Sequence, residues 1–247
     1  MAMTFLTGVS RYAAATATAL ALAACGGGGS DTPTPTTGAT TTFPIAAAMA
    51  SYARDTRTVP FTLTGTGTGT SAGQTIAVTG SGNIASTIIA GTFEGAPAQV
   101  RTLTTTGTLT AQGASSTVSD RTVAFYDANY QALGSSTASG YCVHSGITGL
   151  PASAKVGDTG TWYSATCYTN STKSVRTGAV AVSYAIESLT ATSVILKVTF
   201  KVTPQIGTVT TQEIPYTITA AGAVSAGETA VTLTVNGVAV SVIFKFL

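Results

Sequence analysis

The sequence predicts an all-β fold, a curved antiparallel sheet of about eleven strands with one short N-terminal helix. From Thr58 onward, Thr, Val and Ile recur at every second position between Gly- and Asn-containing breaks, which is typical of strands and hairpins. Near the end, Asn236-Gly237 separates two alternating runs and favours a tight two-residue hairpin turn. Burying the alternate Val, Ile and Phe residues requires either a half-barrel around an apolar groove or a two-sheet sandwich.

The only helical pattern precedes these strands, in Phe43–Arg54. This segment is rich in Ala, has Pro44 near its start and spaces Ile45, Met49 and Tyr52 at helical intervals. We expect one short helix here, covering the open end or one face of the sheet.

The strands are expected in two sets, with a polar Gly/Ser-rich break between them. The first set comprises Val59–Gly67, Gln74–Gly80, Ile84–Glu94, Ala98–Ala111 and Thr117–Asp127. The second set comprises Tyr141–His144, Gly160–Tyr168, Ser174–Leu189, Ser193–Pro204, Thr208–Ala220 and Thr229–Leu247. Weaker turns are predicted at Ser81–Asn83 and Ala220–Gly222. The break, Ala128–Asp158, is either a long excursion within one domain or a boundary between two sheets.

The first residues have the pattern of a processing signal. Arg11 is the only charge before the apolar run Tyr12–Ala24, which is long enough for a signal-peptide core and too short for a membrane-spanning helix. The run ends in Leu22-Ala23-Ala24-Cys25, which resembles the lipobox of bacterial lipoproteins. That resemblance implies cleavage before Cys25 and acylation of its sulfur. An ordinary secretory signal cleaved after Ala24, or a short core helix, is the alternative.

The chain as a whole resembles envelope lipoproteins of Gram-negative bacteria, and no narrower family is identified. The resemblance implies a membrane anchor made by the lipid on Cys25, usually of two or more acyl chains. Gly26, in place of an acidic residue, implies the outer membrane in the enterobacterial members. We divide the chain into a signal peptide (1–24), an acylated Cys with a disordered Gly/Thr/Pro tether (25–42) and a β domain (43–247). No stretch after the signal is apolar enough to predict a transmembrane span.

The charge content argues against a nucleic-acid partner. Without Arg11, ten basic residues accompany nine acidic ones, and no Lys/Arg cluster appears. Only 8% of residues are charged, so solubility must come from Thr, Ser, Gly and Asn on strand faces and turns.

The two cysteines after the lipobox are predicted to form a disulfide. Cys142 and Cys167 form an even pair in an oxidising envelope compartment. In the chain-entropy model the bridge would stabilise the fold by roughly 3–4 kcal/mol. Two free buried thiols are the alternative, because sequence alone does not place the two side chains opposite each other.

The sequence predicts no catalytic residues, no metal site and no cofactor. His144 is the only histidine, which excludes a two-histidine zinc site. Its neighbour Ser145 would point to the opposite face of a strand, and no Gly-x-Ser-x-Gly elbow is present, so we expect a structural or surface role for His144. The Gly67–Ala72 segment lacks the helix that a phosphate-binding loop needs. The acidic residues are scattered singly, although distant carboxylates could still meet in space.

One region stands out as a possible binding surface. Phe125–Tyr168 holds seven of the 18 aromatic residues together with the only His and both candidate bridging cysteines. Tyr and Trp combine apolar area with a polar tip and could form a platform for a sugar, a peptide or a lipid headgroup. Aromatic packing around the disulfide is the alternative. The candidate residues are Tyr126, Tyr130, Tyr141, Trp162, Tyr163 and Tyr168.

These observations favour a non-enzymatic envelope module that binds a protein, a glycan or a cell-wall partner. The alternative is a carrier of lipid or another apolar ligand, whose sheet would keep part of its concave face unfilled. A hydrolase ranks third, because the single His and the missing elbow disfavour it.

Overall fold

The computed structural model describes residues 41–68, 75–235 and 238–247, and within them one helix precedes thirteen strands. The helix is α2 (Ile45–Arg54). The strands are β1 (Thr58–Thr68), β2 (Thr75–Phe93), β3 (Ala96–Ala111), β4 (Ala114–Tyr126), β5 (Ala132–Thr137), β6 (Gly140–Ser145), β7 (Thr159–Tyr168), β8 (Arg176–Thr190), β9 (Ser193–Pro204), β10 (Thr210–Thr219), β11 (Val224–Ala226), β12 (Thr229–Val235) and β13 (Val238–Phe246). The predicted all-β class with a short N-terminal helix is confirmed.

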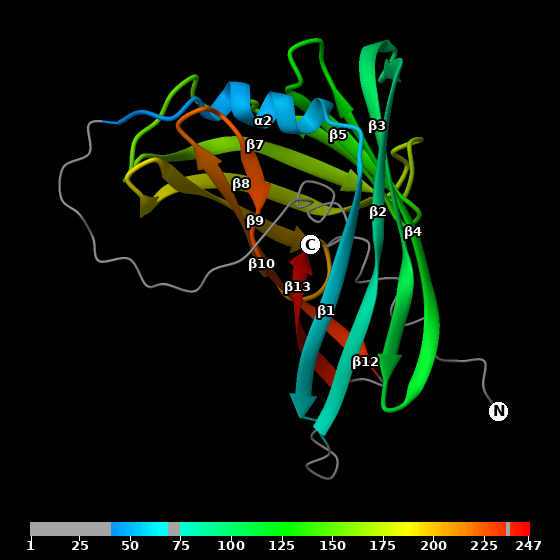
Figure 1. The fold of residues 1–247 in the computed structure, drawn as a ribbon. Helices are drawn as coiled ribbons and strands as arrows, with labels where there is room; N and C mark the ends of the chain where they lie inside the picture. The colour runs from blue at the N-terminus through cyan, green and yellow to red at the C-terminus, as the bar shows by residue number, and fades with distance from the viewer. Residues whose placement is uncertain (1–40, 69–74, 236–237) are drawn as a thin grey trace.

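All of these strands belong to one antiparallel sheet. Its order is β11-β10-β9-β8-β7-β6-β5-β4-β3-β2-β1-β13-β12, so neighbouring strands are mostly consecutive in the chain and the two ends of the sheet are β11 and β12. The sheet is strongly curved: β1–β4 with β12 and β13 form one part, β7–β10 run across it, and α2 lies over one end (Figure 1). The β5–β6 hairpin lies between β4 and β7, so the Ala128–Asp158 segment continues this sheet and does not separate two sheets.

The predicted turn at Ser81–Asn83 is wrong, because β2 runs through it without interruption. Gly82 pairs with Phe61 of β1 on one side and with Gly107 of β3 on the other. A Cβ at Gly82 would lie 2.1 Å from the Thr106 carbonyl oxygen and 2.9 Å from the Phe61 ring. Gly82 therefore allows the Phe61 ring and the neighbouring strand to pack closely against the sheet. From the local sequence alone, a glycine with this role looks the same as a glycine in a turn.

Two other turn predictions concern the last third of the chain. The predicted turn at Ala220–Gly222 is confirmed: it joins β10 to β11, and Gly222 has a φ of +83°. Asn236-Gly237 lies outside the described residues, but the flanking strands β12 and β13 pair antiparallel up to Val235↔Val238. The expected C-terminal hairpin is therefore present.

The strand count differs from the prediction for three reasons. The segments predicted on either side of Ser81–Asn83 form the single strand β2, and the segment predicted as Thr229–Leu247 forms the two strands β12 and β13. The strands β5 and β11 have six and three residues and were not predicted. A strand of three residues, such as β11, carries too few alternating positions for a period of two to be recognised.

The main core fills the inner face of the sheet. Alternate residues of β9 and β10 point inward, and Leu196, Val198 and Tyr216 are 0% exposed. Ile45, Met49 and Tyr52 of α2 pack on the same core, as their helical spacing predicts. The helix therefore closes one end of the curved sheet (Figure 1).

A second, smaller cluster lies on the opposite face of the sheet. It contains Phe93, Ala98 and Tyr141, with Phe125 packed against them. In β6, Tyr141 alternates with Cys142, so their side chains lie on opposite faces.

In the described part of the chain, no helix is both long and apolar enough to cross a bilayer.

Candidate functional site

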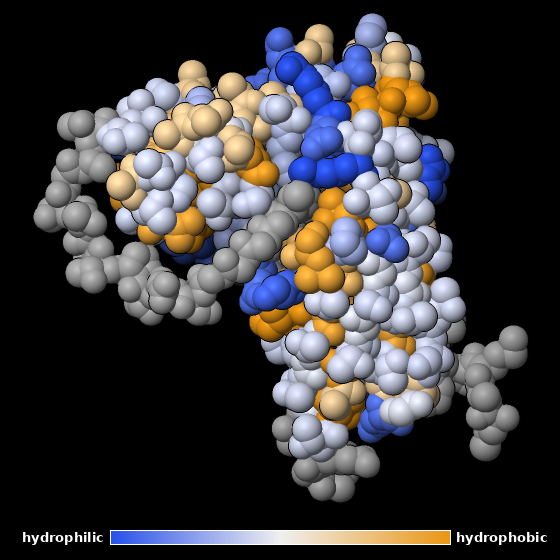
Figure 2. All heavy atoms as spheres, in the orientation of Figure 1, coloured by the Kyte–Doolittle hydropathy of each residue, from blue (hydrophilic) through white to orange (hydrophobic). Residues whose placement is uncertain are grey.

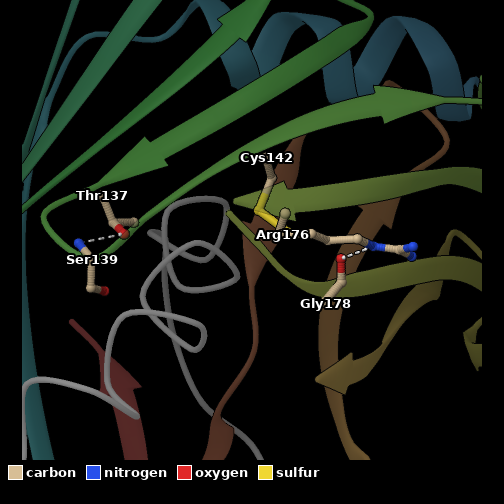
Figure 3. The surroundings of a disulfide bond; sticks show 6 residues. Thr137, Ser139, Cys142, Arg176 and Gly178 are labelled. Atoms are coloured by element: carbon tan, nitrogen blue, oxygen red, sulfur yellow. Dashed lines mark hydrogen bonds between the residues drawn. A yellow bond between two sulfur atoms is a disulfide. The ribbon is translucent and has the colours of Figure 1, made fainter. Parts of the chain in front are cut away.

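The predicted disulfide is confirmed between Cys142 of β6 and Cys167 of β7. The two residues are direct cross-strand partners, and both are half-buried. Figure 3 shows the bridge beside Arg176, whose Nε donates a hydrogen bond to the Gly178 carbonyl oxygen at 3.4 Å. The disulfide thus joins the β5–β6 hairpin covalently to the strand that follows it in the sheet.

The six candidate aromatic residues do not lie on one exposed platform. Tyr126, Tyr141, Trp162 and Tyr163 are each at most 7% exposed. Trp162 and Tyr163 belong to the main core, whereas Tyr141 belongs to the cluster on the opposite face. Tyr168 is half-buried at the end of β7. Core packing accounts for four of the six, and the hydrophobic clusters that contain Tyr141, Trp162 and Tyr163 do not include the disulfide cysteines.

The structure does bring three of the candidates together under the helix. Tyr126, Tyr130 and Trp162 line a small cavity of about 60 Å³ beside Met49 of α2. The rings of Tyr126 and Tyr130 lie 5.9 Å apart. Tyr130 is half-buried, and the guanidinium carbon of Arg54 lies 4.6 Å from its ring centroid. A cation over an aromatic face is attracted to the ring, so the Arg54 guanidinium lies against Tyr130.

His144 occupies a structural position next to the aromatic core. Its ring stacks on Tyr163 with the centroids 4.1 Å apart. Its Nδ1 lies 3.1 Å from the Ala132 carbonyl oxygen, which can only accept, so Nδ1 carries the hydrogen. Burial lowers the pKa of His144 to about 4, although the hydrogen bond to Ala132 acts in the opposite direction. The histidine is therefore neutral at pH 7.

This buried imidazole predicts a pH-dependent stability. The unfolded chain binds a proton at His144 near pH 6.5, and the folded chain binds it near pH 4, so stability falls as the pH drops through this window. Between about pH 7 and pH 5 we expect the free energy of unfolding to fall by about 2 kcal/mol. Urea denaturation at both pH values measures this change. The substitution His144→Gln should remove most of it, and equal losses in both proteins would contradict the assignment.

A polar network covers the cluster on the opposite face. The Tyr141 hydroxyl donates a hydrogen bond to Glu94 Oε1 at 2.6 Å, and Lys173 Nζ pairs with Glu94 Oε2. The interactions with Lys173 and Tyr141 lower the pKa of Glu94. Burial and the Glu94 carboxylate raise the pKa of Tyr141. The network ties the β2–β3 turn to β6 and to the segment after β7.

Sequence reasoning missed a cleft at the end of α2. The cleft has a volume of about 310 Å³, and the last turns of α2, the link to β1 and the β10–β11 turn surround it. Figure 2 shows hydrophilic side chains gathered over the junction of α2 and β1. The lining residues are Ala48, Ser51, Tyr52, Arg54, Asp55, Arg57, Gly222, Ala223 and Val224.

A buried arginine lies behind this cleft. Arg101 of β3 is 2% exposed, and its Nε donates to Ser86 Oγ at 2.9 Å. Its Nη2 donates to the Asp55 carbonyl oxygen at 3.4 Å, and its guanidinium carbon lies 5.7 Å from the Tyr52 ring. Among the described residues, Nη1 has no hydrogen-bond acceptor. Burying a guanidinium without a carboxylate partner is costly, which sets this residue apart from the rest of the core.

The sequence does carry a signal for Arg101. It lies two residues before Leu103, a buried core residue of β3, and alternation places both on the inner face. The local pattern does not show that Arg101 lies close to Asp55, which is 46 positions earlier in the chain.

Fold and site together define an all-β protein with one open, curved antiparallel sheet and a cationic cleft at its helix-covered end. In the described ranges, no group of three or more His, Cys, Asp or Glu side chains is arranged to hold a metal ion. No protein-family model, no curated protein and no solved structure matches the chain.

Proposed function

We propose that this chain is a lipid-anchored protein of the bacterial cell envelope whose β domain is a non-enzymatic binding module. The lipobox-like Leu22–Cys25 segment, which lies outside the described residues, supports the anchor. The lipid on Cys25 makes the membrane its first partner. Gly26 favours the outer membrane, and the Thr/Pro-rich tether would let the β domain reach an envelope protein or glycan.

The packed inner face of the sheet favours a binding module over a carrier of apolar ligands. Aliphatic side chains of β8, β9 and β10 occupy the inner face, with Val182, Val194 and Ile214 at most 1% exposed. Tyr216 of β10 and Tyr52 of α2 meet across this space with ring centroids 5.8 Å apart. Because side chains occupy the volume that an apolar ligand would need, recognition falls to the outer surface and to the cleft beside α2.

The surroundings of His144 support a non-enzymatic role. The ring is held between Tyr163 and the Ala132 carbonyl group. The adjacent Ser145 is exposed, and successive strand residues point to opposite faces, so the histidine is not directed at this hydroxyl.

Native mass spectrometry with lipid extraction tests the proposal on the Cys25→Ser chain purified from the periplasm. We expect a mass without adduct, because buried side chains of β8, β9 and β10 occupy the inner face of the described part of the sheet. A stoichiometric apolar adduct would overturn the binding-module proposal and favour the carrier alternative. Denaturing mass spectrometry of the same sample gives the reference mass.

A further inference from the structure

We propose that the cleft at the end of α2 binds a phosphate-type oxyanion. The guanidinium groups of Arg54 and Arg57 would hold it, and Arg101 would supply a fixed positive charge behind the cleft wall. This inference rests on the geometry of the described residues and is independent of the lipid anchor.

The charged side chains around the cleft are mostly positive. Arg54, Arg57 and Arg101 gather around the α2–β1 junction, and Asp55 is the acidic residue that lines the cleft. The Asp55 carboxylate pairs with Arg57, with Oδ2 and Nη1 3.0 Å apart. Three positive charges and one negative charge leave an excess of about two, which a phosphate group of charge −1.5 to −2 at neutral pH would balance.

One of these positive charges, that of Arg101, is buried. A guanidinium stays protonated in a protein, so Arg101 cannot relieve its burial by losing a proton. Two of its contacts reach the cleft wall, since the Asp55 carbonyl oxygen accepts its hydrogen bond and Tyr52 presents its ring, whereas Ser86 and Tyr126, which it also contacts, lie outside the cleft lining. Both residues line the cleft. In a medium of low dielectric constant, the charge of Arg101 attracts an anion in the cleft more strongly than an exposed charge would.

Two arginines that line the cleft supply hydrogen-bond donors. Arg54 is exposed, and its guanidinium lies over Tyr130, outside the cleft lining, so it would turn from that ring to donate to the anion. The Arg57 guanidinium carbon lies 5.2 Å from the Tyr52 ring centroid. Arg57 Nε is buried and has no acceptor among the described residues. The planar fork of a guanidinium matches the oxygen spacing of phosphate and binds it through two parallel hydrogen bonds. The volume of about 310 Å³ accommodates a phosphate group together with part of the molecule that carries it.

Isothermal titration calorimetry with inorganic phosphate tests the site, using the full Cys25→Ser chain at constant ionic strength with chloride as the competing anion. The double variant Arg54→Gln/Arg57→Gln should raise the Kd about tenfold or more, because it removes both positive charges and the charge-assisted hydrogen bonds that the guanidinium groups would donate. The matched control Arg121→Gln/Lys201→Gln removes two exposed charges outside the cleft and should leave the Kd unchanged. Phosphate binding no stronger than chloride binding, or equal weakening in both variants, would overturn the proposal.

Arg101 needs its own variant, because its loss could disturb the core. Arg101→Lys keeps the charge but loses the fork, and near-ultraviolet circular dichroism reports whether the core stays packed. A folded Arg101→Lys protein should bind phosphate with less than tenfold loss, because Arg101 acts mainly through its charge. If the Arg101→Lys protein binds phosphate as weakly as the Arg54→Gln/Arg57→Gln protein, Arg101 does not act mainly through its charge, and this part of the proposal is wrong.

Vesicle flotation separates the two sources of such a group. Binding to phosphatidic acid vesicles and not to phosphatidylcholine vesicles, lost in Arg54→Gln/Arg57→Gln, identifies a lipid headgroup. Binding of inorganic phosphate without vesicle binding identifies a soluble phosphate compound. The Cys25→Ser chain lacks the proposed lipid anchor. A negative result with phosphate or with vesicles therefore does not bear on membrane attachment through Cys25, which fractionation tests separately.

Discussion

The substitution Cys25→Ser is expected to transfer the protein from the membrane fraction to the soluble periplasmic fraction. The proposed thioether to diacylglycerol would require the cysteine sulfur, so a serine at this position would leave the chain without that lipid. Each buried CH₂ of an acyl chain contributes about 0.8 kcal/mol to membrane binding, and two or more chains give stable anchoring. Fractionation followed by immunoblotting measures the change, which we expect to be nearly complete.

The other two cysteines provide the matched control for this experiment. The double variant Cys142→Ser/Cys167→Ser loses the disulfide but keeps Cys25, so it should stay in the membrane fraction. The Cys25→Ser protein should keep the far-ultraviolet circular dichroism spectrum of a strand-rich fold. Retention of the Cys25→Ser protein in the membrane would remove the case for a lipid anchor on this residue.

Removal of the disulfide is expected to cost the largest share of stability. The bridge closes a sequence separation of 25 residues, for which chain entropy predicts about 3.5 kcal/mol. For a domain of this size, that loss corresponds to a fall in Tm of roughly 10 °C. The strands β5 and β6 have six residues each, so their pairing depends on the covalent link more than that of the longer strands does.

Urea denaturation of Cys142→Ala/Cys167→Ala measures this loss. The control is Ser145→Ala/Ser164→Ala, an exposed cross-strand pair on the same two strands, whose stability should change by less than about 0.5 kcal/mol. Wild-type protein treated with a reductant should unfold at the same urea concentration as the cysteine variant. A loss below about 1 kcal/mol would show that the unfolded chain gains little freedom when the bridge is absent.

Most of the fold could be predicted from the sequence, but the role of Gly82 and the short strands could not. The helix was predictable because Ile45, Met49 and Tyr52 share one helical face, and the long strands because one residue in two is apolar. Gly82 was misassigned to a turn, since its reason lies in the ring of Phe61 on the neighbouring strand. No local pattern contains that contact.

The candidate site, too, was only partly predictable from the sequence. The cysteine pair could be predicted from composition and compartment, and the structure places Cys142 opposite Cys167. The aromatic residues were predicted as a group, but whether each is buried depends on which face of the sheet it occupies and on what covers that face. Tyr126 and Trp162 are buried, whereas Tyr130 is partly accessible.

By itself, then, the sequence determined the class of fold, the helix, the C-terminal hairpin and the cysteine pair, because each depends on residues close together in the chain or on composition. The tertiary structure alone decided that all thirteen described strands form one sheet, that Arg54 and Arg57 line one cleft and that Arg101 donates a hydrogen bond to Asp55 in its wall. The reason is physical: alternation specifies which face a side chain occupies, but strand register and curvature specify its neighbours. A charge cluster assembled from α2, β3 and the α2–β1 link exists only after those strands have paired.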